Sequence, residues 1–229
     1  MSVRLRRPFA CTMLALLAVA ALLAACGDGD GPNTCFDSNA FSYGFRPAAD
    51  TTIVFHWPAG RMPVRFYADT GGDLRANVLA SLTTWVNAFH CQEAYFQRVD
   101  DSTRADVIVR QATILPPVGA AVRSLGADSV GACVGRTDFQ IDSTRRLTGP
   151  FRAYIVPLAA GDPVTLAGCF RMTTTHEIGH TLGIFTHSPD PDDLMYSTPR
   201  RSTLSPDDRY TLQRLYHTDT TVRPAPATR

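Results

Sequence analysis

The residues best suited to chemistry lie in one short run, THEIGHTLGIFTHS, at positions 175–188. His176 and His180 are four residues apart, so in a helix their rings share one face and can reach one cation. Imidazole nitrogens suit Zn²⁺, which in catalytic sites takes three protein ligands and keeps one position open. Glu177 is adjacent to the first histidine, where its carboxylate could take a proton from a metal-bound water and pass it to a leaving amine. The run therefore predicts a hydrolytic zinc site.

The third zinc ligand must come from further along the chain. Gly183 can end the helix in a left-handed turn, which lets the chain double back and deliver His187 as that ligand. The only other glutamate in the chain is Glu93, upstream, which excludes a thermolysin-like site with a downstream glutamate ligand. An aspartate ligand stays open, because three aspartates follow the motif: Asp190, Asp192 and Asp193. We take His187 as the predicted ligand.

This region resembles the metzincin zinc peptidases and, among them, the matrixins. Their pattern HExxHxxGxxH is matched by His176, Glu177, His180 and Gly183, whereas His187 comes one residue later than in the family. The resemblance implies an α+β metzincin-like domain, with a single twisted mixed sheet, a long helix, an active-site helix and a C-terminal helix. It also implies one catalytic zinc and a protein or peptide substrate. The family allows calcium as well, but no calcium ligands can be located in this sequence.

Two further segments extend the resemblance toward the C-terminus. Leu194-Met195-Tyr196 resembles the matrixin methionine turn, in which the residue at the position of Met195 lies beneath the metal without binding it. Ser197 then becomes a candidate pocket residue. The run LSPDD at 204–208 and the helix expected after it resemble the matrixin C-terminus.

The length, composition and charge of the chain indicate which classes of protein are possible. The chain has 229 residues, 45% hydrophobic and 19% charged, which supports one globular domain with a real core. Its formal net charge is +1, and its basic residues, all arginines, are scattered beyond the first seven positions. This pattern predicts no nucleic-acid binding. We expect a monomer.

The N-terminus has the pattern of an export signal. Arginines at positions 4, 6 and 7 precede the apolar stretch 9–25, as in a secretory signal peptide. The run LAAC at 23–26 resembles the lipobox of bacterial lipoproteins. That resemblance implies loss of residues 1–25, lipidation of Cys26, a tether over 26–50 and membrane contact only through the lipid. Gly27 favours the outer membrane where the cell has one; an ordinary signal peptide or an uncleaved anchor stays open.

Four more cysteines follow Cys26: Cys35, Cys91, Cys133 and Cys169. An even number in an exported protein predicts two disulfides with three pairings, of which Cys35–Cys91 with Cys133–Cys169 is one. Buried free thiols are the alternative.

Periodicity and turn residues predict the elements that position the motif. Strands are expected at 51–57, 64–67, 94–99, 106–110, 135–141 and 153–156. Helices are expected from 73 to about 91, from about 170 to 182, and from Ser205, an N-cap, onward. Residues 118–135 should be irregular, the peptidase domain should span 51–217, and 218–229 should be disordered. A peptide substrate would add a strand along 135–141.

The function that these features favour is a zinc-dependent endopeptidase that hydrolyses peptide bonds of extracytoplasmic proteins, with Glu177 activating the water. Two alternatives stay open: a zinc amide hydrolase acting on cell-wall peptides, and a non-catalytic zinc-containing binding lipoprotein. The glutamate argues against the second, because holding zinc as structure does not need it.

Overall fold

The computed structural model describes residues 40, 42–69, 73–125, 127–130, 132–158 and 162–225. The predicted signal peptide, Cys26 and most of the predicted tether lie outside these residues, so those predictions stay untested. No helix within the described part of the chain combines the length and apolar character needed to cross a membrane.

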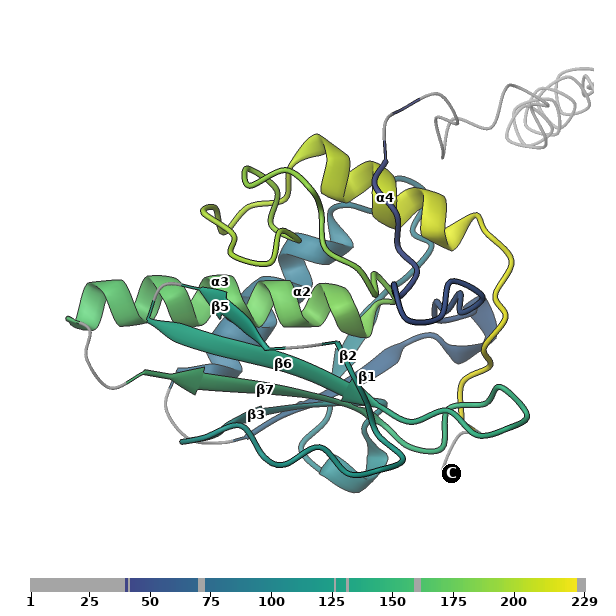
Figure 1. Ribbon diagram of the computed structural model, residues 1–229, viewed down its shortest axis with the longest axis horizontal. Helices are drawn as coiled ribbons and strands as arrows, with labels where there is room; N and C mark the ends of the chain where they lie inside the picture. Colours follow the sequence, from purple (N-terminus) through teal and green to yellow (C-terminus); the bar gives the residue numbers. More distant parts are fainter. Residues whose placement is uncertain are drawn as a thin grey trace, which may run out of the picture. The chain divides into compact units, whose positions relative to one another are not determined.

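One mixed sheet of seven strands forms the central layer (Figure 1). The strands are β1 (Val64–Ala68), β2 (Phe96–Arg98), β3 (Val107–Gln111), β4 (Arg123–Ser124), β5 (Asp128–Val130), β6 (Cys133–Phe139) and β7 (Phe151–Pro157). Their order is β2-β1-β3-β7-β6-β4, with β5 also paired to β6. The pairs among β2, β1, β3 and β7 are parallel, whereas β6 is antiparallel to all three of its neighbours. Of two short 3₁₀ helices, Ala59–Arg61 precedes β1 and Ser102–Arg104 lies between β2 and β3.

Three helices lie on one side of this sheet in Figure 1: α2 (Leu74–Val86), α3 (Pro163–Thr181) and α4 (Pro206–Tyr216). α2 and α3 contact each other and both contact the sheet. Alternate residues of the central strands are buried on this side, as the period of two requires: Val107 and Val109 on β3, and Phe151, Ala153 and Ile155 on β7. The predicted α+β fold with a single mixed sheet is confirmed.

The helix that carries the motif begins earlier than its periodicity predicts. α3 starts at Pro163 rather than near Phe170, because the Asp162 side chain caps it by accepting from the backbone N–H groups of Val164 and Thr165. A capping aspartate followed by proline is a standard helix start. The helix ends at the predicted place, just before Gly183, whose φ is 111°.

One expected strand was wrong, and so was the expected disorder of the tail. Residues 51–57 form no strand; instead the Val54 carbonyl accepts from the N–H groups of Thr221 and Val222, at 2.9 and 3.1 Å. The tail is therefore not disordered from residue 218, since its described part reaches Ala225 and Val222 is fully buried. The segment 51–57 and the C-terminal tail are therefore hydrogen-bonded to each other, and no local sequence pattern indicates this contact.

The limits of the folded unit also differ from the prediction. Tyr43 and Phe45 are buried in the core, so packing begins before residue 51. Residues 118–135 are not irregular throughout, because they contain β4, β5 and the start of β6.

One disulfide, Cys133–Cys169, joins the start of β6 to α3. Cys91 is disulfide-bonded as well, and Cys35 lies outside the described residues. The interpretation of the described cysteines as free thiols is therefore wrong.

Candidate active site

The first two histidines of the motif project from the last turns of α3. Both are fully buried, and their ring centroids are 4.7 Å apart. The Nδ1 atom of His176 donates to the Leu194 carbonyl at 2.7 Å, and that of His180 donates to the Ile184 carbonyl at 2.5 Å. Such bonds orient the rings and leave each Nε2 lone pair free for a metal.

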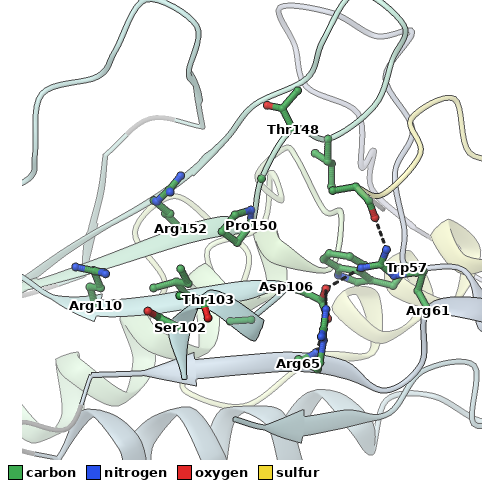
Figure 2. A pocket seen from close by; sticks show the side chains of 15 residues that line it. Trp57, Arg61, Arg65, Ser102, Thr103, Asp106, Arg110, Thr148, Pro150 and Arg152 are labelled. Carbon is green, nitrogen blue, oxygen red and sulfur yellow. Dashed lines mark hydrogen bonds and ion pairs between the residues drawn. The ribbon is translucent and has the colours of Figure 1, made fainter. Parts of the chain in front are cut away.

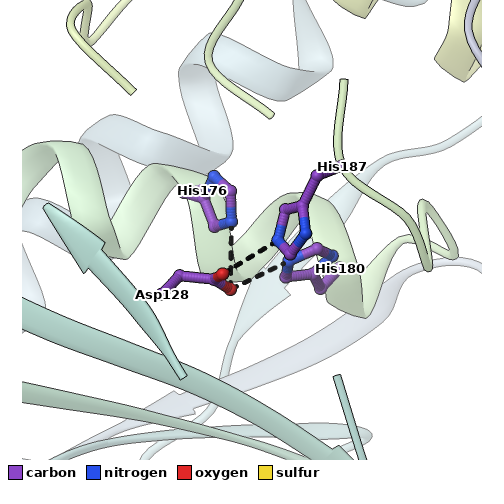
Figure 3. Close-up of side chains that lie close together, drawn as sticks. All are labelled: Asp128, His176, His180 and His187. Atoms are coloured by element: carbon purple, nitrogen blue, oxygen red, sulfur yellow. Dashed lines mark ion pairs between the residues drawn. The ribbon is translucent and has the colours of Figure 1, made fainter. Parts of the chain in front are cut away.

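The return loop brings His187 to the same point despite its additional residue. Its ring centroid lies 5.4 Å from that of His176 and 5.1 Å from that of His180. Figure 3 shows the three rings converging. The aspartates considered as alternative ligands, Asp190, Asp192 and Asp193, are not in this group.

A fourth group, which sequence reasoning missed, faces the three histidines. Asp128 on β5 places its Oδ2 atom 3.4 and 3.5 Å from the Nε2 atoms of His176 and His180, and its Oδ1 atom 3.0 Å from that of His187 (Figure 3). In the sequence, Asp128 is one of many aspartates, and its distance along the chain from the histidine motif matches no ligand pattern. Only strand pairing brings it here.

This arrangement fits a metal ion. The ligand atoms of Asp128 and the three histidines all lie within 4.8 Å of one another. The three Nε2 atoms and Asp128 Oδ2 are buried and have no hydrogen-bond partner. Buried polar atoms are rarely left unpaired, and four electron-pair donors converging on one point need a cation between them. Nitrogen and carboxylate ligands in this number suit Zn²⁺.

The catalytic candidate Glu177 is fully buried beside this group. Its Oε2 atom accepts a hydrogen bond from the Thr137 hydroxyl at 2.6 Å, while Oε1 has no partner. Gly135 on β6 leaves the room for it, because a Cβ there would lie 2.2 Å from Glu177 Oε1. The carboxylate is thus fixed on one side and free on the other.

Burial and charge act on these groups together. Burial, and after it the negative charge of Asp128, raises the pKa of Glu177, against the opposing hydrogen bond from Thr137. Burial lowers the pKa of His180 to about 4, which favours the neutral imidazole that binds metals. Burial opposes ionisation of Asp128, yet the three histidines hold its pKa below the usual range.

The predicted methionine turn lies directly under the motif helix. Met195 is fully buried, and a Cβ at Gly179 of α3 would lie 2.5 Å from its Sδ atom. Ser197, the candidate pocket residue, is half-buried two residues further on. Its role stays a prediction.

Asp208 positions this turn, a role that the sequence did not reveal. Its carboxylate accepts from the backbone N–H groups of Leu194 and Met195, at 2.8 and 3.2 Å, and from the Tyr43 hydroxyl at 2.6 Å. It also completes the capping box of α4 with Ser205. The Asp208 side chain therefore connects α4 to the methionine turn beneath the candidate metal site.

A separate pocket of about 630 Å³ lies on the sheet face opposite the helices (Figure 2). Its base is Asp106, which accepts hydrogen bonds from Arg61 at 2.8 Å and from three N–H groups of Arg65 at 2.9 Å. None of the predicted site residues lines this pocket.

Fold and site together define a metzincin-like zinc metallopeptidase: a mixed sheet, a motif helix with two histidines and a glutamate, a returning third histidine and a methionine turn. Comparison with known families is more specific. Residues 137–217, from β6 to the end of α4, match the family model described as Matrixin. Over these residues the chain resembles the matrixins, and the chain is a zinc metallopeptidase.

Solved structures similar to this chain include that of myroilysin, with 16% identity and a TM-score of 0.41, covering 72% of this chain and 96% of that one. Another is high choriolytic enzyme 1, a hatching enzyme zinc-protease from Oryzias latipes (medaka fish), with 11% identity and a TM-score of 0.29. That match covers 60% of this chain and 50% of the other. Comparison with curated proteins found no match.

Proposed function

We propose that this metallopeptidase is an endopeptidase that cleaves extracytoplasmic proteins, with His176, His180 and His187 as its zinc ligands and Glu177 as its general base. The observation that carries the proposal is the buried Glu177 carboxylate beside the converging histidines, with Thr137 on one oxygen and no partner on the other. The Cys133–Cys169 disulfide supports action in an oxidising compartment, as does the signal-like N-terminus.

The chain's own residues divide the chemistry between them. Bound zinc supplies a Lewis acid for the scissile carbonyl and for the attacking water. Glu177 takes the proton on Oε1 and later donates it to the leaving amine. Thr137 keeps the carboxylate from rotating away, and the Leu194 and Ile184 carbonyls hold two histidines in the ligating orientation.

The test is Glu177→Gln, which keeps the shape of the side chain and removes its basicity. Glu93→Gln is the matched control, because it makes the same change in the only other glutamate, which contacts His217 away from the site. We expect both variants to retain about one zinc per chain. Cleavage of casein should fall about 10²–10⁴-fold in the first only, the range for loss of general-base catalysis. Casein cleavage at the wild-type rate by Glu177→Gln would refute the mechanism. Chelator-sensitive hydrolysis of cell-wall peptides without casein cleavage would instead favour the amide-hydrolase alternative.

A further inference from the structure

The edge of the sheet where a peptide substrate is expected to bind is already paired with the chain itself. β7 lies along one side of β6, and β4 and β5 lie along the other. The N–H of Leu125, between these two short strands, also donates to the Thr137 carbonyl at 3.2 Å. An extended peptide can add to β6 only where that edge is free. In this conformation it would have to displace β5.

The register of this hairpin aims Asp128 at the histidines. Ser124 is opposite Asp138 and Asp128 is opposite Gly135, so the outer chain advances four residues while β6 advances three. Asp128 and Gly135 then share a face of the sheet, and the missing side chain of Gly135 leaves space over Glu177.

Asp128 occupies the position that catalysis needs. Three histidines and one carboxylate make a complete tetrahedral set, whereas a catalytic zinc keeps its fourth position for water and substrate. The Asp128 carboxylate reaches all three Nε2 atoms, at 3.0 to 3.5 Å, and its side chain is only 5% exposed.

The chain that leads to β5 is well placed to open. Much of the segment 112–125 is exposed, including Ile114 and Val118. It is held to β6 by the two residues of β4, by the Leu125 N–H, and by Arg136, whose guanidinium donates to the Pro116 carbonyl at 2.7 Å. The Cys133–Cys169 disulfide anchors β6 to α3, but it does not anchor β5. β5 can therefore leave while β6, Glu177 and the histidines stay in place.

We propose that this structure is a self-closed state, in which β5 fills the substrate edge and Asp128 is the fourth zinc ligand, and that the enzyme opens by releasing β5. This inference rests on the proposed function. It assigns a regulatory role to Asp128, a residue outside the matched motif.

The experiment compares the full chain with Asp128→Ala and Asp128→Asn, the second of which keeps the side-chain volume if the first fails to fold. Asp192→Ala is the matched control: its carboxylate is on the loop after His187, exposed and outside the metal-binding group. Each protein is loaded with Co²⁺, whose visible absorption depends on the number and geometry of its ligands. It is then titrated with acetohydroxamate, a small chelator that needs an open metal position.

We expect Asp128→Ala to keep one metal per chain, to change the Co²⁺ spectrum, and to bind acetohydroxamate at least about tenfold more tightly than wild type. That factor corresponds to a site closed about 90% of the time. Asp128→Asn should change in the same direction, and Asp192→Ala should match wild type. An unchanged spectrum and an unchanged affinity in both Asp128 variants would overturn the proposal. Loss of metal from both would also overturn it, since Asp128 would then be an obligatory ligand of a structural zinc.

The double variant Asp128→Ala, Glu177→Gln separates this inference from the proposed function. Tight acetohydroxamate binding by both Asp128→Ala and the double variant, with casein cleavage by neither, would support self-closure and refute the endopeptidase. Cleavage by wild type at the Asp128→Ala rate, with equal acetohydroxamate affinity, would support the endopeptidase and refute self-closure.

Discussion

Gly183→Ala tests how the return loop delivers the third histidine. Gly183 has a φ of 111°, in the region that side-chain-bearing residues rarely adopt. An ideal Cβ at this position would lie 1.9 Å from the Phe55 carbonyl oxygen and 3.1 Å from Leu215 Cδ2. The first contact is with backbone, so no rotamer change relieves it. The loop, the Phe55 segment or both must move.

The expected loss combines two effects. The positive φ costs an alanine about 1–2 kcal/mol, and forcing a methyl group into filled space typically costs about 1–3 kcal/mol more. Together they predict a destabilisation of about 2–5 kcal/mol, or about 2–4 °C in Tm for each kcal/mol in a domain of this size. His187 lies four residues further on, so its displacement should also weaken zinc binding.

The assay is thermal unfolding of zinc-free protein, followed by zinc affinity from competition with a chromogenic chelator. Gly168→Ala is the control, because Gly168 is inside α3 and a Cβ added there would have nothing within 4 Å. That variant should be as stable as wild type or more stable by up to about 1 kcal/mol, from helix propensity. A Gly183→Ala protein with wild-type Tm and wild-type zinc affinity would refute the reasoning.

Three further predictions concern residues that support the site or the sheet. Burial raises the pKa of Asp106, but the hydrogen bonds from Arg65 lower it more, so the net shift is downward. The charged form of Asp106 therefore stabilises the folded state at pH values above the unfolded-state pKa. Asp106→Asn should lower the free energy of unfolding by about 2–4 kcal/mol at pH 7. In urea titrations this difference from wild type should shrink as the pH falls through the folded-state pKa of Asp106. A difference that does not change with pH would contradict this reasoning. Asp208→Ala should lower zinc affinity as well as stability, because it releases the methionine turn; equal zinc affinity in chelator competition would show that the turn does not need it. The double substitution Cys133→Ser, Cys169→Ser should lower the free energy of unfolding in urea by about 3–4 kcal/mol, because the disulfide closes a loop and restricts the unfolded chain. An unchanged free energy of unfolding would mean that the unfolded chain is already restricted without the disulfide.

Much of the site could be predicted from the sequence because its geometry is local. Residues four apart on a helix share a face whatever the rest of the fold does, so His176 and His180 had to converge once α3 formed. The Ser205 cap of α4 and the end of α3 before Gly183 also depend on neighbouring residues only. Strands β1, β3 and β7 were predicted for the same reason, since alternation and branched side chains are properties of short segments.

Contacts between distant segments were decided by the tertiary structure alone. Residues 51–57 look like a strand, but their partner is the C-terminal tail rather than the sheet. Asp208 looks like an ordinary helix-cap residue, but α4 packing turns it into the anchor of the methionine turn. Asp128 has no sequence signature, and the pairing of β5 with β6 places it over the histidines. Backbone geometry fixes which residues of one element share a face, whereas only the packing of that element against others decides what the face meets.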